Sequence, residues 1–132
     1  MNIAVCIDRD GGMMFLNRRQ SMDRVQRAKL LSLTGGELFL NEYTARMFED
    51  KNRLHISENF LEEAGEEDLC FVENIRFDIN KVSTLYIFKW NERYPKDFSF
   101  EYDLSNFKKQ KTEKFEGYSH AKITLEVYAR KD

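Results

Sequence analysis

Four short apolar runs, each bounded by polar or turn-forming residues, most constrain how this chain can fold. The runs are NIAVCID, ELFLN, RLHIS and DLCFVEN, at residues 2–8, 37–41, 53–57 and 68–74. Runs that are apolar on both faces suit strands covered on both sides. Stretches with helical character separate them, and strands joined through helices pair in parallel by right-handed crossovers. The pattern therefore predicts an α/β fold with a mainly parallel sheet.

The clearest helix signal lies between the first two runs. Apolar residues recur at helical spacing from Met22 to Leu31, and Gly35 follows as a stop. The Ser21 hydroxyl can cap such a helix, with Asp23 in its positive first turn. We predict a helix over residues 22–33, preceded by a polar loop that contains NRRQ.

The last third of the chain changes character. STLYIFKW, at residues 83–90, is a long strand, and DFSFEYD alternates again at residues 97–103. A lysine-rich strand, a turn at residues 116–119 and a closing strand with Ile123, Leu125, Val127 and Ala129 on one face read as a hairpin. We predict a three-layer α/β fold with a mixed, mainly parallel central sheet and an antiparallel C-terminal hairpin, in a single domain over residues 1–132.

Six aromatic residues of this region have two interpretations. They are Tyr86, Phe88, Trp90, Phe98, Phe100 and Tyr102. Cross-strand packing in the core is the first interpretation, because aromatic pairs stabilise antiparallel strands. The second is that some of them pair two subunits in a homodimer.

Composition limits the partners and the compartment. Lys plus Arg number 21 against 23 for Asp plus Glu, a formal net charge of -2, so steering toward nucleic acid or an anionic membrane is not expected. No run approaches the ~18 apolar residues needed to span a bilayer. Cys6 and Cys70 lie inside apolar runs and suit buried free thiols in a reducing cytoplasm. On neighbouring strands, the two thiols could touch.

The order of the runs and several strings within them resemble the dihydrofolate reductase family over nearly the whole chain. MNIAVCID is similar to that family's first strand, and VSTLYIFKW resembles its L-Y-L-T strand. AKLLSLTGGELFLNEYTARMF is similar to a helix, strand and helix that read approximately F-K-x-x-T-x-G-x-x-V-I-M-G-R-x-T in reductases. The resemblance implies a dihydrofolate reductase-like fold and a short, divergent bacterial member of that superfamily.

The cofactor positions implied by the resemblance carry the wrong chemistry for NADPH. In reductases a glycine lets the backbone approach the cofactor and the next residue, an arginine, holds a phosphate; here those positions are Asn41 and Glu42. A carboxylate at a helix start repels an anion. Thr44 matches the threonine of the motif, and we expect it to cap the helix.

A second departure follows the fourth apolar run. The family has paired glycines there, which let a diphosphate lie against the backbone, whereas this chain has Glu73 and Asn74. Two acids at two phosphate positions disfavour NADPH, and we expect no cofactor.

The pterin-binding acid of the family is also out of register. Counting from Thr34 places Gln26 at that position, and slippage of the loop allows Val25 or Asp23. The supporting threonine of the L-Y-L-T strand falls on Phe88, which cannot form a hydrogen bond. Reduction of a pterin therefore lacks both its acid and the partner of that acid.

No metal site is expected. His55 and His120 are the only histidines, and they have no metal-ligand spacing. The sequence also lacks the H-x-H-x-D-H cluster of the metallo-β-lactamase superfamily, which excludes a ribonuclease Z.

We expect a cytoplasmic protein of this fold that has lost reductase activity, a pseudoenzyme that binds a small ligand or acts as an interaction module. Its cleft should lie at the carboxyl ends of the central strands, and the ligand should be neutral or cationic. The expected lining is Asp8, Asn17, Arg19, Gln26, Asn41, Glu42, Glu73 and Asn74. One alternative is a divergent NADPH-dependent reductase or a hydrolase that uses Asp23 or Glu73 as a general acid. Another is a homodimeric structural protein.

Overall fold

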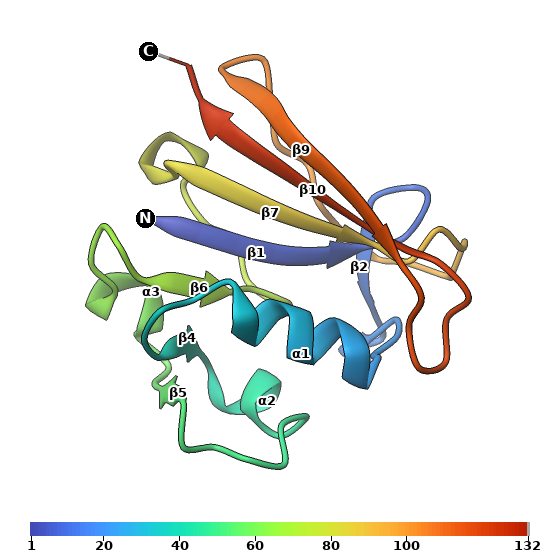
Figure 1. Cartoon of the computed structure of the whole chain (residues 1–132), viewed down its shortest axis with the longest axis horizontal. Coiled ribbons are helices and arrows are strands. Elements are labelled where there is room, and N and C mark those ends of the chain that lie inside the picture. The colour runs from blue at the N-terminus through green and yellow to red at the C-terminus, as the bar shows by residue number, and fades with distance from the viewer. Residues whose placement is uncertain (132) are drawn as a thin grey trace.

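The chain folds around a seven-stranded sheet (Figure 1), described for residues 1–131 in a computed structural model. The strand order is β5-β4-β6-β1-β7-β10-β9. The strands are β1 (Asn2–Ile7), β4 (Leu38–Leu40), β5 (Leu54–Ile56), β6 (Leu69–Phe71), β7 (Thr84–Lys89), β9 (Phe107–Phe115) and β10 (Ile123–Arg130). The first five in the sheet order pair in parallel, whereas β10 is antiparallel to both β7 and β9. The predicted fold class is confirmed.

Three layers result because both faces of the sheet are covered. On one face, Leu30 of α1 (Arg24–Ser32) and Ala45 of α2 (Glu42–Ala45) pack in a cluster with Phe88. On the other, Phe60 of α3 (Phe60–Glu63) packs with Val5 of β1. A second sheet of β3 (Arg18–Arg19), β2 (Gly12–Phe15) and β8 (Phe98–Ser99) joins this second face, and a short 3₁₀ helix, η1 (Ile79–Lys81), precedes β7. A single domain over residues 1–132 stays a prediction.

The two cysteines lie on neighbouring strands, as expected, but the predicted contact between them is wrong. Cys70 of β6 pairs with Ile3 of β1, and Cys6 lies three residues beyond Ile3. Because side chains alternate along a strand, the two thiols face opposite sides of the sheet. Both are free, and burial raises the pKa of the Cys70 thiol to about 12, so it is protonated and unreactive at neutral pH.

Helix α1 begins two residues later than predicted, and its cap is Asp23, not Ser21. The Asp23 backbone is extended, with φ -155° and ψ 130°, and its carboxylate accepts hydrogen bonds from the N–H groups of Val25 and Gln26. Serine and aspartate are comparable caps, so tertiary contacts of the two side chains decide where the helix begins.

The segment that contains NRRQ is a β-hairpin, so the predicted loop is wrong. Met14 pairs with Arg19, and Phe15 pairs with Arg18. The two residues between the strands, Leu16 and Asn17, have φ values of 51° and 61°, as a two-residue hairpin turn requires. Asparagine tolerates this left-handed conformation, but leucine rarely adopts it.

The prediction that the six aromatic residues lie in the core is confirmed for Phe88 and Trp90, but the predicted cross-strand packing of residues 86–90 with residues 98–102 is wrong. Phe88 and Trp90 are buried in the cluster beneath α1, with 0% and 3% of their surface exposed. Phe98, Phe100 and Tyr102 pack against the cluster on the opposite face. Phe88 and Trp90 therefore have no free surface for a second copy of the chain, and a homodimer stays a prediction.

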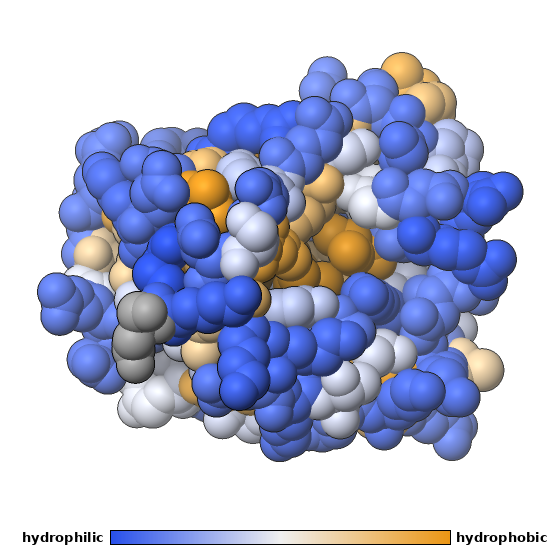
Figure 2. Space-filling model, turned by 90° about the horizontal axis from the view of Figure 1, so that it is seen from above, coloured by the Kyte–Doolittle hydropathy of each residue, from blue (hydrophilic) through white to orange (hydrophobic). Residues whose placement is uncertain are grey.

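The lysine-rich strand β9 lies at one edge of the main sheet, where lysine side chains oppose association with another sheet. Seen from above, the molecular surface is mostly hydrophilic, and hydrophobic side chains gather in a hollow near its middle (Figure 2). Within residues 1–131, no helix is long and apolar enough to span a bilayer.

Candidate functional site

The carboxyl ends of the parallel strands β1, β4 and β6 lie at the same edge of the sheet. Asp8 follows β1, Asn41 follows β4, and Glu73 and Asn74 follow β6 by two and three residues. Ligands of open α/β sheets bind at such an edge. The side chains predicted to line this cleft divide into separate groups.

The Asp8 carboxylate links two segments that border the site. Its side chain is buried and accepts hydrogen bonds from the Gly12 N–H at 2.7 Å, the Gln20 amide at 3.0 Å and the Tyr94 N–H at 3.0 Å. Burial alone would raise the pKa of Asp8, but the donors from Gly12 and Tyr94 outweigh it, so the pKa is lowered. The carboxylate therefore ties the β2–β3 hairpin to the loop after β7.

Arg19 and Glu73 form a bidentate ion pair. Arg19 Nε lies 2.9 Å from Glu73 Oε2 and Nη2 lies 3.1 Å from Oε1. Thr44 Oγ1 also donates to Oε1 at 2.9 Å. Burial opposes the charge of Arg19, but Glu73 outweighs it and raises the pKa of the guanidinium. Arg19 therefore neutralises the acid that stands at the second implied phosphate position.

Asn41 and Asn74 form the next group. Asn41 Nδ2 donates to Asn74 Oδ1 at 2.9 Å, and Asn41 Oδ1 accepts from the Thr44 N–H at 3.0 Å. Asn41 is therefore the cap of α2, and the capping role predicted for Thr44 is wrong. Glu42 is exposed, and its N–H donates to the Glu58 carboxylate at 2.9 Å.

The remaining predicted lining residues lie apart. Gln26 is buried on α1 with 1% of its surface exposed, and its Nε2 has no hydrogen-bond partner among residues 1–131. Asn17 is exposed in the hairpin turn. Of the eight predicted side chains, the structure therefore joins Arg19 to Glu73 and Asn41 to Asn74.

Asp23, one of the two predicted general acids, is held by the turn between β9 and β10. Six donors reach its carboxylate at 2.8 to 3.3 Å: the N–H groups of Val25, Gln26, Tyr118 and Ser119, the Ser119 hydroxyl and His120 Nδ1. Burial raises the pKa of Asp23, but the Tyr118 N–H and the His120 imidazole outweigh it, so the pKa lies far below its usual range. A carboxylate in this environment holds no proton to donate at neutral pH.

The turn approaches Asp23 closely because of Gly117. A β-carbon at this position would lie 2.6 Å from Asp23 Oδ2 and 2.8 Å from Ile123 Cδ1. Only glycine fits so near a neighbouring side chain without displacement. Sequence reasoning missed this cluster, because 97 residues separate Asp23 from His120 and no local spacing relates them.

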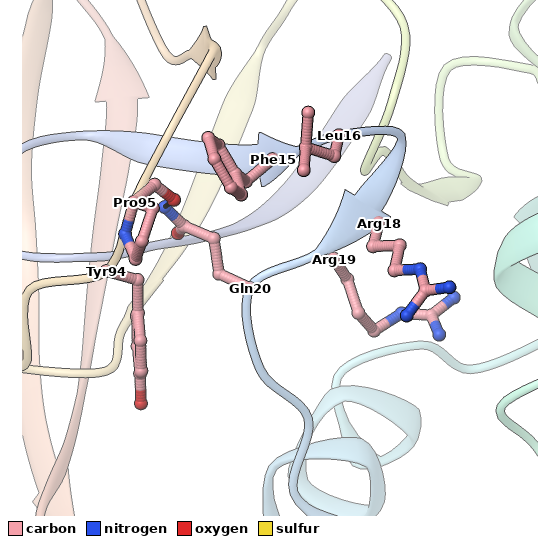
Figure 3. A pocket seen from close by; sticks show the side chains of 7 residues that line it. All are labelled: Phe15, Leu16, Arg18, Arg19, Gln20, Tyr94 and Pro95. Carbon is pink, nitrogen blue, oxygen red and sulfur yellow. Dashed lines mark hydrogen bonds between the residues drawn. The ribbon is translucent and has the colours of Figure 1, made fainter.

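Two hollows flank the β2–β3 hairpin. The first has a volume of about 470 Å³ and is lined by Phe15, Leu16, Arg18, Arg19, Gln20, Tyr94 and Pro95. Figure 3 shows Tyr94 and Pro95 on one side of Gln20 and the two arginines on the other, with Phe15 and Leu16 at a third side. The second, of about 420 Å³, is lined by Arg18, Arg19, Ser21, Met22 and Tyr43. Of these residues only Arg19 was predicted.

No protein-family model matches the sequence, and no curated protein matches it. Among solved structures, the chain is similar to one described as "Dihydrofolate reductase from Enterococcus faecalis complexed with NADP(H)and RAB-propyl". The TM-score is 0.71 at 17% sequence identity, and the match covers 100% of this chain and 97% of that chain. The chain has a dihydrofolate reductase-like fold. The resemblance drawn from the residues is thus confirmed for the fold.

Metal-binding side chains do not gather in the part of the chain that the structure describes. No three His, Cys, Asp or Glu residues among residues 1–131 lie close enough together to hold an ion.

Proposed function

We propose that the chain binds a small, neutral organic molecule at the carboxyl edge of its dihydrofolate reductase-like sheet, without NADPH-dependent reduction. The observation that carries this proposal is the bidentate pair of Arg19 with Glu73, together with the hollow of about 470 Å³ beside it. A hollow of this size is typical of sites for small ligands.

The lining of the larger hollow supports a ligand with a flat apolar body. Phe15, Tyr94 and Pro95 offer apolar surface, whereas the Gln20 amide nitrogen already donates to Asp8 and Pro95. Phe15 and Leu16 are exposed over 37% and 68% of their surface, so a ligand that covers them gains hydrophobic free energy. Because Arg19 neutralises Glu73, this carboxylate does not favour a cationic ligand.

At the two phosphate positions that the family resemblance implies, the donors already have partners within the chain. The Glu42 N–H donates to Glu58, the Thr44 N–H donates to Asn41, and the Arg19 guanidinium is paired with Glu73. The enterococcal neighbour is described with NADP(H), so the same fold accommodates that cofactor elsewhere. The residues present here do not fit it, because a phosphate would have to displace two carboxylates from their donors.

A general-acid role for Glu73 gains no support from its surroundings. Arg19 and Thr44 both donate to this carboxylate, so its oxygens are bonded to partners within the chain. A reductase or a hydrolase that depends on proton donation from Glu73 is therefore a weaker candidate than a binding protein.

Thermal-shift measurements test the proposal. We expect at least one member of a panel of neutral heteroaromatic compounds to raise the melting temperature of the full chain, and NADPH and folate to leave it unchanged. Phe15→Ala should abolish the response. Ile56→Ala is the matched control, because Ile56 is exposed to nearly the same extent, 38% against 37%, and does not line the hollow.

The same screen can refute the proposal. A clear rise in melting temperature with NADPH would contradict the loss of the cofactor site. An equal response of the Phe15→Ala variant to the neutral compound would place that compound elsewhere on the protein.

A further inference from the structure

Ser21, His120 and Asp23 form a continuous chain of hydrogen bonds. Ser21 Oγ lies 2.8 Å from His120 Nε2, and His120 Nδ1 lies 2.9 Å from Asp23 Oδ2. Ser21 is half-buried, whereas only 8% of His120 and 2% of Asp23 are exposed. We propose that Ser21 is a nucleophile, that His120 is its general base, and that the site hydrolyses a small carboxylic ester with an apolar acyl group.

The position of Asp23 fixes the tautomer of His120. An ionised carboxylate only accepts hydrogen bonds, so the proton of the neutral imidazole lies on Nδ1, where Asp23 accepts it. Nε2 is then left with a lone pair that faces the Ser21 hydroxyl. A serine activated by a base that a third group orients is the arrangement that nucleophilic catalysis requires.

The imidazole is also held by packing. Trp90 stacks on the ring of His120, with centroids 4.6 Å apart and an interplanar angle of 26°. The Ser119 hydroxyl lies 3.2 Å from Nδ1 and donates to the same Asp23 oxygen. Asp23 is a positioning residue, fixed by the turn that carries His120 and by the first turn of α1.

Two exposed apolar side chains, Met22 and Tyr118, lie beside members of the triad. Met22 lines the hollow that contains Ser21, and the N–H of Tyr118 donates to Asp23. Exposed apolar surface beside a hollow suits the binding of an apolar group.

Arg18 supplies a charged donor to the same hollow. It lines the hollow with Ser21 and forms no ion pair within residues 1–131, unlike Arg19, which is neutralised by Glu73. A guanidinium with free N–H groups is available to an oxyanion that develops during acyl transfer.

The reaction has two balanced steps. Ser21 Oγ bonds to the ester carbonyl carbon as its proton passes to His120 Nε2, and collapse of the tetrahedral intermediate breaks the bond to the leaving oxygen, which takes that proton. Water then attacks acyl-Ser21 while His120 accepts a proton from it. Cleavage of the bond to Ser21 Oγ, with return of the proton to this oxygen, releases the carboxylic acid.

Covalent labelling of the full chain with a fluorophosphonate, read by peptide mass spectrometry, tests the proposal. We expect one adduct, on Ser21, and hydrolysis of p-nitrophenyl acetate that Ser21→Ala lowers by about 10²-fold or more, the lower end of what a positioned general base supplies. His120→Gln should lower the rate of labelling and the rate of hydrolysis to a similar extent. Ser32→Ala is the matched control, because within residues 1–131 the Ser32 hydroxyl bonds only to the Lys29 carbonyl.

Circular dichroism of each variant separates lost chemistry from lost folding. Asp23→Asn, with its labelling rate divided by the folded fraction, should label more slowly than Asp103→Asn, whose carboxylate serves only a local turn. An unlabelled wild-type protein, or hydrolysis that persists in Ser21→Ala, would overturn the proposal. Labelling of Ser21 at an unchanged rate in His120→Gln would overturn the role of the base.

Discussion

Glu73 and Asp23 are two buried carboxylates near the same edge of the sheet, and their partners make them different. Glu73 is paired with a guanidinium and a hydroxyl, and Asp23 accepts four backbone N–H groups, a hydroxyl and one imidazole. A guanidinium does not release its proton in proteins, whereas a neutral imidazole has a nitrogen lone pair that can accept one. The first cluster is therefore fixed in charge, and the second leaves a base beside a serine.

One short segment connects the two clusters. Arg19 bonds to Glu73, Gln20 bonds to Asp8, and Ser21 bonds to His120, so three consecutive residues reach three different parts of the edge. The β2–β3 hairpin thus sets the spacing between the ion pair and the triad. Variants of residues in each cluster test whether Glu73 and Asp23 differ in the way that their partners predict.

The largest effect is expected from Asp23→Asn. The substitution removes the charge from six hydrogen bonds and turns one acceptor into a donor that faces N–H groups. We expect a loss of about 4 kcal/mol in the free energy of unfolding, measured by urea denaturation. Asp103→Asn, at an exposed carboxylate, should cost less than about 0.5 kcal/mol. Equal losses in the two variants would refute the special role of Asp23.

The same carboxylate predicts an acid-sensitive fold. The pKa of Asp23 is depressed in the folded chain, because the Tyr118 N–H and the His120 imidazole outweigh the effect of burial. Its stabilisation is therefore complete above the unfolded pKa of about 4 and is lost as pH falls below that value toward the folded pKa. The difference in free energy of unfolding between wild type and Asp23→Asn should shrink from about pH 6 to about pH 3. A constant difference over that range would contradict the depressed pKa.

Breaking the ion pair of Arg19 with Glu73 should cause a smaller loss of stability, and the effects of changing the two residues should be strongly coupled. Glu73→Met leaves Arg19 partly buried without its partner and should cost about 3 kcal/mol of unfolding free energy. Arg19→Met combined with Glu73→Met should recover part of that loss, with a coupling energy of about 2 kcal/mol in a double-mutant cycle. The pair of Arg93 with Asp10, exposed over 69% and 40% of the side chains, is the matched control and should couple by less than about 0.5 kcal/mol. A coupling energy for Arg19 and Glu73 as small as that of the control would show that the pair does not fix the edge.

The smallest effect concerns the hairpin turn that lies between the clusters. Leu16 has a φ of 51°, which costs a leucine about 1 kcal/mol, so Leu16→Asn should stabilise the chain by about that amount. The same substitution should weaken binding of an apolar ligand, because Leu16 lines the larger hollow. Asn17→Leu, at φ 61°, is the reciprocal control and should destabilise the chain. Destabilisation by Leu16→Asn would mean that packing of the leucine outweighs its strain.

Most of the fold could be predicted from the sequence, because the strands and their order along the chain follow from local apolar patterns. The apolar runs at residues 2–8 and 68–74 became the adjacent central strands β1 and β6, and the lysine-rich run became the edge strand β9. The hairpin at residues 12–19 was missed because a leucine in a left-handed conformation gives no turn signal. The start of α1 was misplaced because Ser21 and Asp23 are both good caps, and only tertiary contacts decide between them.

The site was less accessible from the sequence, because its partners are far apart along the chain. Glu73 and Arg19 were both expected at the edge, but nothing local indicates that they bond across 54 residues. Ser21 and His120 are separated by 99 residues, and each has an ordinary structural interpretation by itself. The charge of a site depends on such pairs, so it follows from the fold and not from the types of residue alone.

Calorimetric titration of NADPH into the full chain tests most directly the claim that the donors at the two phosphate positions implied by the family resemblance are already occupied. The pairs of Arg19 with Glu73, of Glu42 with Glu58 and of Thr44 with Asn41 predict no heat beyond dilution up to about millimolar cofactor. Saturable binding with a dissociation constant in the micromolar range would contradict the claim.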